Sequence, residues 1–271
     1  MKPIASMAVV VNPHKTGVME LSRDITQEAE KMGVSCAILS DYPIKPHALD
    51  VFDVCCVIGG DGTILGAVPE AVRSSTPILG VNLGKLGFLA TYTPEGIIER
   101  LPQVIEGQYC IDERTLIRCG QEGETPLIAL NDVVIKSTSI NLMHLQVFQN
   151  CKRVADYHCD GLIFATPTGS TAYNLSAGGP ILHPQNHSIA MTPICPHTLS
   201  NRSFIFPDSV ELRVECDCAV YKPSLSIDGR AYPGDDPVFP FHISVSPEKI
   251  RLIHDSEYSH YQMLRTKLNW V

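Results

Sequence analysis

The chain has 271 residues, of which 44% are hydrophobic and 18% are charged, and its formal net charge is -8 at pH 7. This composition supports one large or two modest domains with a sizeable core and excludes an intrinsically disordered chain. The acidic balance argues against a protein that coats nucleic acid. The chain has no run of about 18 apolar residues, and its first apolar run is too short for a signal peptide, so we expect a cytoplasmic protein with no membrane partner.

The first 107 residues alternate strand patterns with helix patterns. Strands are expected at 7–12, 34–39, 51–58 and 77–81, and helices at 21–32, 64–72 and 93–106. Such alternation predicts a parallel sheet with right-handed crossovers, which is a Rossmann-like α/β domain. Ligands of these sheets bind beyond the carboxyl ends of the strands.

After Gly107 the pattern changes to short apolar runs separated by Pro, Gly, Asn and Asp. The runs lie at 127–135, 142–148, 162–166, 210–214, 225–227 and 238–245. They predict a C-terminal, mainly antiparallel β domain over residues 108–254. The tail, residues 255–271, is expected to join the domain of residues 1–107 through a final helix over 258–270. The predicted fold class is therefore α/β, with a Rossmann-like domain followed by a β domain.

The ten cysteines include no C-x-x-C pair, so the usual spacing of zinc ligands is missing. Cys55 and Cys56 are adjacent inside an apolar run, and Cys216 and Cys218 alternate along an expected strand. We therefore expect reduced, buried thiols and no disulfide framework.

The third expected strand ends in Gly59-Gly60-Asp61-Gly62-Thr63, just before an expected helix. Glycines allow backbone N–H groups to approach phosphate oxygens at the positive end of a helix. Asp61 places a negative charge where those oxygens would lie, which suits a carboxylate that orients a hydroxyl nucleophile or holds a metal ion. The alternative is a plain turn in which Asp61 is the N-cap of the helix.

A second segment, residues 160–180, concentrates hydroxyls, an amide, an aromatic ring and small residues. Such a loop offers donors to a polar ligand, and Tyr173 offers a stacking surface. Upstream, Asn131 and Asp132 end an apolar run, and an amide beside a carboxylate suits the hydroxyls of a ribose. From the residues alone, each of these features could also be an ordinary polar loop or turn.

Four motifs occur in one order: Gly59-Gly60-Asp61-Gly62-Thr63, residues 81–89, Leu130-Asn131-Asp132 and residues 160–180. Together they closely resemble the bacterial NAD kinases, from about Met7 to Asp228. Residues 160–180 are the specific part, because Gly-Gly-Asp-Gly is shared with diacylglycerol, sphingosine and phosphofructo-kinases. The resemblance implies transfer of the ATP γ-phosphoryl group to the 2′-hydroxyl of the adenosine ribose of NAD, giving NADP, with Mg²⁺ or Mn²⁺ bridging the nucleotide phosphates.

The resemblance also implies roles for individual residues. Asp61 matches the catalytic carboxylate, and the neighbouring glycines would lie along the phosphates. The implied ligand contacts are Gly59, Gly60, Asp61, Gly62, Asn131, Asp132, His158, Asp160, Thr171, Ala172, Tyr173, Asn174, Leu175, Ser176 and Arg230, with Tyr173 near the adenine. No protein metal ligand is implied. The family binds NAD at a subunit contact, so a homodimer or homotetramer is expected and Asp160 would serve a neighbouring site.

Three positions depart from the family pattern. Asp132 replaces the usual Glu, His158 stands where many relatives carry Arg, and Arg230 replaces a frequent Gln. None of them removes the central carboxylate, so we expect altered ligand contacts and retained activity. The resemblance also implies that residues 1–107 bind the phosphate donor and that residues 108–254 bind NAD.

Two other functions remain open. A lipid kinase could share the glycine loop, although the polar residues 171–176 argue against it. A non-catalytic NADP(H)-binding sensor is suggested by the three departures. The sequence also leaves open whether polyphosphate replaces ATP, whether NADH is accepted and whether NADP(H) feeds back.

Overall fold

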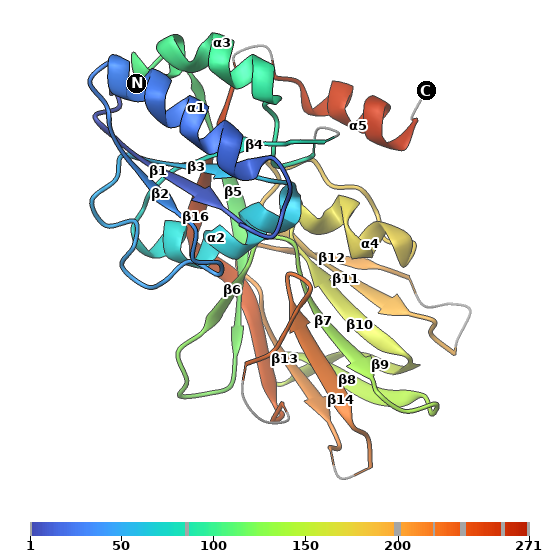
Figure 1. The fold of residues 1–271 in the computed structure, drawn as a ribbon. Coiled ribbons are helices and arrows are strands. Elements are labelled where there is room, and N and C mark those ends of the chain that lie inside the picture. The colour runs from blue at the N-terminus through green and yellow to red at the C-terminus, as the bar shows by residue number, and fades with distance from the viewer. Residues whose placement is uncertain are drawn as a thin grey trace. The chain divides into compact units, whose positions relative to one another are not determined.

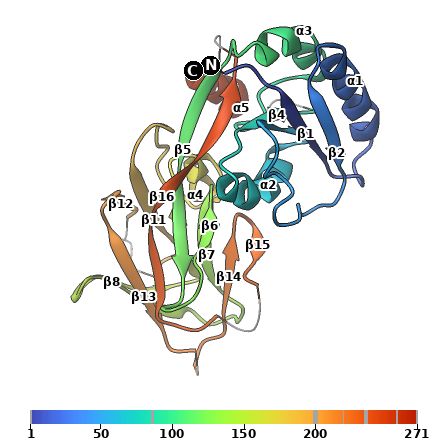
Figure 2. The ribbon, with the colours of Figure 1, turned by 90° about the vertical axis from the view of Figure 1, so that its left-hand side faces the viewer.

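The computed structural model describes residues 2–84, 87–197, 202–218, 220–233, 237–255 and 258–269 (Figure 1). The chain forms two compact units: one joins Met1–Glu113 to Ile250–Val271, and the other is Arg114–Lys249. Two long strands, β5 (Cys110–Gly120) and β16 (Phe241–His254), begin in one unit and end in the other, and they pair with each other (Figure 2). The first unit is therefore built from two separate stretches of chain.

A parallel sheet flanked by helices forms the first unit. Its strands lie in the order β2 (Ser35–Leu39), β1 (Ser6–Val11), β3 (Val54–Ile58), β4 (Ile78–Val81) and the end of β16, with every neighbouring pair parallel. The helices are α1 (Val18–Lys31), α2 (Asp61–Arg73), α3 (Pro94–Ile105) and α5 (His260–Leu268). Helices α1 and α3 cover one face of the sheet and α2 the other (Figure 1). The predicted Rossmann-like domain is confirmed.

Burial on both faces explains the continuous apolar runs of this sheet. Every residue of β3 and β4 is buried. Along β3, Val54, Cys56 and Ile58 belong to the core under α1 and α3, so Cys55 and Val57 face α2 because side chains alternate along a strand.

The predicted helix caps are present. Helix α1 ends at Lys31 with Met32 as its C-cap, and Gly33 follows with a φ of 82°, the left-handed conformation that glycine adopts after a helix. Before α3, the backbone N–H of Gly96 donates a hydrogen bond of 3.0 Å to Oγ1 of Thr93, and Pro94 takes the first helical position.

Two antiparallel sheets form the second unit. One has the order β12 (Phe204–Pro207), β11 (Ser188–Ile194), β10 (Gly161–Ala165), β7 (Asp132–Ser137), β14 (Pro223–Ile227) and β15 (Arg230–Ala231). The other has the order β16, β13 (Glu211–Cys216), β8 (Met143–Gln149) and β9 (Lys152–Cys159), with β5 and β6 (Leu127–Ala129) attached. Buried side chains of both sheets form one core, so the sheets pack face to face. The predicted β domain is confirmed.

Five strands of the second unit were not predicted from the sequence. These are β5, β9, β11, β12 and β15. Strand β9 is mostly polar, β11 contains Pro193, and β5 contains Arg114, whose side chain is only 1% exposed. The single strand expected at 127–135 is wrong, because the chain leaves the sheet at residues 130 and 131, between β6 and β7.

The tail forms α5, which is shorter than the helix expected over 258–270. Residue 270 lies outside the described residues. The ring of His260 in α5 lies 6.2 Å from the ring of Phe88, so the helix contacts the loop that follows β4 in the same unit. Among the described residues, no helix has the length and apolar character needed to cross a membrane.

All ten cysteines are free thiols. The expectation that they are buried is confirmed for Cys55, Cys56, Cys119 and Cys159, whereas Cys36 and Cys216 are half-buried, and it is wrong for Cys110, Cys151, Cys195 and Cys218, which are exposed. These four lie at strand ends or in turns, where water reaches one side of the chain.

The cap of α3 provides a test of the first unit. Thr93→Ala removes the side-chain oxygen that accepts from the N–H of Gly96, so the free energy of unfolding should fall by about 1 kcal/mol. Thr93→Ser keeps a hydroxyl in place and should retain most of this stability. Urea unfolding followed by circular dichroism measures both. Equal losses in the two variants would mean that the hydrogen bond contributes nothing.

Candidate active site

The glycine loop joins β3 to α2. Gly59 has a φ of 153°, and a Cβ at this position would lie 2.3 Å from Oγ1 of Thr63, so no other residue fits without a local shift. Gly60 is the N-cap of α2 and Asp61 is the first helical residue, so the alternative that Asp61 is the N-cap is wrong. A Cβ at Gly60 or Gly62 would meet no atom within 4 Å, which leaves the backbone of the loop open to a ligand.

The Asp61 carboxylate is held by three consecutive backbone N–H groups. Oδ2 accepts from Phe88 at 2.9 Å, and Oδ1 accepts from Leu89 and Ala90, both at 3.1 Å. A Cβ at Gly87 would lie 1.9 Å from Oδ1, so the loop can come this close only because residue 87 is glycine. A carboxylate has about four acceptor sites, so one remains for another donor.

These contacts give a physical reason for the motif at residues 81–89. The motif follows β4, the neighbour of β3, and therefore meets the glycine loop at the carboxyl ends of adjacent parallel strands. Its Lys85 and Leu86 lie outside the described residues.

Lys15 and Tyr42 also contact the glycine loop, and neither was predicted as a site residue. The Lys15 ammonium donates to Oγ1 of Thr63 at 2.8 Å, and the Tyr42 hydroxyl donates to the carbonyl of Gly62 at 2.9 Å. Lys15 lies in the turn after β1, another carboxyl end of the same sheet. Its position after a parallel strand was the only signal that could have selected it.

In the second unit, the Asp228 carboxylate holds the turn that contains Asn131 and Asp132. It accepts from the backbone N–H groups of Leu130 at 2.9 Å, Asn131 at 2.6 Å and Asp132 at 3.2 Å. Asp228 itself has a φ of 50°, which is uncommon for a residue other than glycine. The sequence pointed to the Asn131-Asp132 pair but not to the carboxylate that holds it.

Asp132 and Asp228 both carry buried carboxyl groups, since the two residues are only 5% and 7% exposed. Burial, and next the charge of Asp228, raise the pKa of Asp132 to about 7. Burial also raises the pKa of Asp228, although the three N–H groups and the charge of Arg230 oppose that shift. Arg230 therefore belongs to the same group of residues.

The segment 160–180 is joined to the Asn131 turn by its backbone. The N–H of Thr166 donates to the carbonyl of Asn131 at 2.9 Å, and a Cβ at Gly169 would lie 1.9 Å from that same oxygen. The two motifs that were predicted separately therefore form one site in the second unit.

The side chains of residues 171–176 differ in how far they are exposed to solvent. Asn174 is fully buried: its amide donates to the carbonyls of Ser170 and Pro180, and its oxygen accepts from Thr192 at 2.7 Å. These hydrogen bonds of the Asn174 side chain hold the loop in its conformation. Thr171, Ala172, Tyr173 and Leu175 are half-buried and Ser176 is exposed, and the Lys136 ammonium lies 5.6 Å from the centre of the Tyr173 ring. These side chains, unlike that of Asn174, have surface left for a ligand.

His158 and Asp160 lie exposed at the end of β9 and just beyond it. The backbone of Asp160 pairs with Ile194 and Ser137, which fixes its position between strands. The ring of His158 stacks on His144 of the neighbouring strand, with centroids 4.5 Å apart. Within the described part of the chain, no hydrogen bond links either side chain to the Asn131 turn.

A parallel α/β unit with a glycine loop around a carboxylate, followed by a β unit with a polar loop, is the architecture of a nucleotide-binding phosphotransferase. Residues 40–109 match the ATP-NAD kinase N-terminal domain, and residues 130–255 match the ATP-NAD kinase C-terminal domain. The chain belongs to the NAD kinase family.

Individual relatives agree with this assignment. The NAD kinases of Pseudomonas putida (strain GB-1) and Ectopseudomonas mendocina (strain ymp) are each 40% identical over 232 residues, which is 82% of this chain and 77% of theirs. The crystal structure of yeast NADH kinase complexed with NADH aligns with a TM-score of 0.84 and 25% identity, over 100% of this chain and 89% of that one. An NAD kinase from Archaeoglobus fulgidus in complex with ATP shares the fold, with a TM-score of 0.81 and 23% identity over 97% of this chain and 98% of its own.

The raised pKa of Asp132 predicts a pH-dependent stability. Because the pKa is about 7 in the folded protein and 3.8 ordinarily, ionisation of Asp132 destabilises the fold progressively between these two pH values. Asp132→Asn should therefore be more stable than wild type at pH 8, and the difference should vanish near pH 4. Urea unfolding at several pH values measures this. Asp208→Asn, which changes an exposed carboxylate, is the control, and a pH-independent difference for Asp132→Asn would contradict the prediction.

Proposed function

We propose that the chain transfers the γ-phosphoryl group of ATP to the 2′-hydroxyl of the adenosine ribose of NAD, giving NADP. The observation that carries this proposal is the Asp61 carboxylate, held by three N–H groups beside an open glycine loop in a member of the NAD kinase family. Family membership favours this function over a lipid kinase or a non-catalytic sensor.

Asp61 orients the attacking hydroxyl in the proposed reaction. Three of its acceptor sites are used by Phe88, Leu89 and Ala90, so the carboxylate cannot rotate, and the remaining site accepts the hydrogen of one hydroxyl. Proton transfer to this oxygen would accompany attack on the γ-phosphorus. The fixed carboxylate contributes mainly by positioning, as in other phosphoryl transfers.

The glycine loop and Lys15 would bind the phosphates of the donor. Gly59, Gly60 and Gly62 leave the backbone uncovered at the positive end of α2. Lys15 brings a positive charge to within 2.8 Å of Thr63, and its ammonium can move from that hydroxyl to a phosphate oxygen. The first unit thus takes the phosphate donor in this proposal, and the second unit takes the dinucleotide.

For the dinucleotide we propose contacts from the Asn131 turn and the polar loop. The proposed contacts are Asn131, Asp132, His158, Asp160, Thr171, Ala172, Tyr173, Leu175, Ser176 and Arg230, with Asn174 acting through its loop. Asp132 is a methylene shorter than the Glu usual in the family, and the raised pKa of Asp132 lets it donate as well as accept near neutral pH. The NADH held by the related yeast kinase supports a nicotinamide dinucleotide as the ligand.

Mg²⁺ or Mn²⁺ would enter with ATP. The side chains at the glycine loop fit a cation held chiefly by phosphates, because Asp61 is the carboxylate of the loop and has only one acceptor site left. When bound, the cation neutralises charge on the phosphoryl oxygens. We further propose a cytoplasmic homodimer or homotetramer in which Asp160 serves a neighbouring subunit, and light scattering would measure the oligomeric state.

Asp61→Asn tests the catalytic carboxylate. The amide keeps the shape of the side chain but cannot take a proton, so kcat should fall by about 100- to 10,000-fold while NAD binding stays near that of wild type. The assay is NADP formation from NAD, ATP and Mg²⁺. Asp41→Asn, an exposed change in the same unit, should keep full activity. Unchanged turnover in Asp61→Asn would refute its role, and NADP(H) binding without any product from wild type would favour the sensor.

Lys15→Gln tests the proposed phosphate contact. Loss of a charged hydrogen bond should raise the KM for ATP by about tenfold or more and leave the KM for NAD unchanged. Lys45→Gln removes an exposed lysine elsewhere in the same unit and is the matched control. A rise in the KM for NAD alone would show that Lys15 serves the other substrate.

A further inference from the structure

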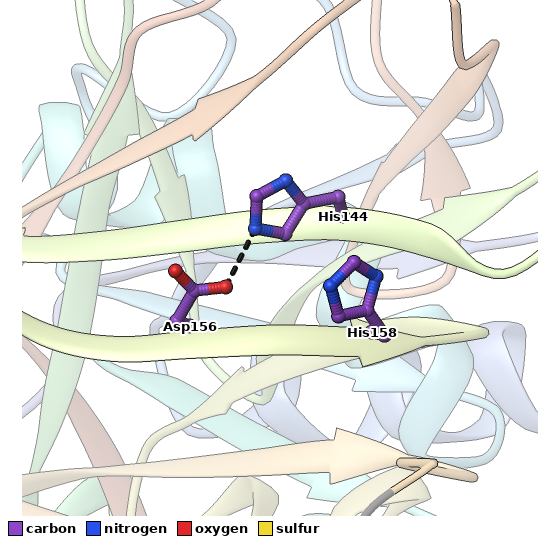
Figure 3. Close-up of side chains that lie close together, drawn as sticks. All are labelled: His144, Asp156 and His158. Carbon is purple, nitrogen blue, oxygen red and sulfur yellow. Dashed lines mark hydrogen bonds and ion pairs between the residues drawn. The ribbon is translucent and has the colours of Figure 1, made fainter.

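Two histidines and an aspartate gather on the β8–β9 hairpin of the second unit (Figure 3). They are His144 from β8 and Asp156 and His158 from β9. One nitrogen or oxygen from each lies within 4.8 Å of the others. Figure 3 shows the three side chains on the same side of the two strands. Asp156 and His158 are exposed and His144 is half-exposed, so water and solutes reach them.

The register of the hairpin brings these residues together. His144 and His158 are directly opposite each other in the antiparallel pair, so their side chains share one face. Asp156 precedes His158 by two positions, which places it on the same face of β9 because side chains alternate along a strand. Two regular strands therefore hold the three groups, and no loop has to become ordered to form the cluster.

The contacts within the cluster show how close the donor atoms are. Nε2 of His144 lies 2.6 Å from Oδ1 of Asp156, and the His144 and His158 rings are nearly parallel, at 8°. A tetrahedral zinc site with bonds of about 2.0 Å requires ligand atoms roughly 3.3 Å apart. The ligand atoms lie within 4.8 Å of one another, so binding requires the side chains, two of them exposed, to rotate toward the cation.

A second layer of contacts orients the aspartate. Oδ2 of Asp156 accepts from the Gln146 amide and from the Arg153 guanidinium, each at 3.0 Å. Because these outer contacts use Oδ2, Oδ1 is the oxygen that can leave His144 for another partner. Arg153 is a positive charge near the cluster and weakens its attraction for any cation.

We propose that His144, Asp156 and His158 form a binding site for a divalent transition-metal cation such as Zn²⁺. Two imidazoles and a carboxylate are the donor set that Zn²⁺ and its neighbours in the series prefer, whereas Mg²⁺ prefers oxygen ligands alone. Three protein ligands leave at least one position for water. A surface hollow lined in part by His144, Gln146 and Asp217 gives the site access to solvent.

The bound cation would join β8 to β9 and take the place of the hydrogen bond between His144 and Asp156. It is separate from the cation that enters with ATP, and its binding does not depend on the proposed phosphoryl transfer. His158, while it ligates the cation, cannot also contact the dinucleotide. The site therefore gives His158 a second role, at one of the three positions that depart from the family pattern.

The test is a calorimetric titration of tag-free, EDTA-treated full-length protein with ZnCl₂, and a parallel titration with CoCl₂ followed by its visible absorption. Wild type should bind one equivalent at micromolar concentrations, and the Co²⁺ spectrum should show nitrogen ligands. Loss of an outer contact typically weakens metal binding by about 10- to 100-fold, and Gln146→Leu should weaken Zn²⁺ binding by about tenfold. The ligand variants His144→Gln, Asp156→Asn and His158→Gln should each weaken it by more than about 100-fold.

His47→Gln is the matched control, because His47 and Asp50 form an exposed histidine–carboxylate pair that lacks a second histidine. That variant should bind Zn²⁺ as wild type does. Absence of Zn²⁺ binding to wild type at 100-fold excess overturns the proposal, as does equal binding by wild type and the His144 and His158 variants. The Co²⁺ spectrum of wild type decides the ligand type independently of how any variant folds.

Discussion

Hydrogen bonds from three consecutive backbone N–H groups to the Asp61 carboxylate are the contact on which the candidate site of the first unit depends. They connect the start of α2 to the loop after β4, so two neighbouring strands of the parallel sheet fix one side chain. A single methyl group at Gly87 would break this arrangement, since it would lie 1.9 Å from the carboxylate. The requirement for glycine therefore comes from packing against a charged oxygen and not from an unusual backbone conformation.

The second unit contains the same kind of contact, a carboxylate that accepts backbone hydrogen bonds, at Asp228. Its carboxylate also accepts from three consecutive N–H groups, those of residues 130–132, and it takes the place of a neighbouring strand at the break between β6 and β7. Here the carboxylate is buried beside a second one, and the repulsion between Asp228 and Asp132 is a cost of forming the site. In each unit a carboxylate thus holds a segment through three backbone N–H groups that are distant in sequence, although the two units have different folds.

Much of this could be predicted from the sequence. Apolar runs buried on both faces marked β3 and β4, and glycine and proline marked the ends of α1 and α3, because these signals are local. The resemblance to NAD kinases identified the family, whereas the domain boundaries and the roles of individual ligand contacts stay predictions. Strands such as β9 were missed because exposed, polar strands have no apolar period, and their pairing is determined by distant residues. Lys15 and Asp228 were missed for a related reason: each acts on residues 48 or more positions away.

The passage of β16 from the second unit into the first has a consequence for how the protein is made. Residues 1–113 leave the ribosome first, yet Ile78 and Leu79 of β4 pair with Leu252 and Ile253 at the end of β16, whereas Val81 is bridged by Tyr92 of the same stretch. Until the second unit has been synthesised, the edge of β4 at Ile78 and Leu79 lacks its partner strand, and an unpaired edge is a template for pairing with another chain. The sheet of the first unit is thus completed by residues made near the end of synthesis, so the interval of translation between residues 113 and 250 leaves part of this sheet without its last strand.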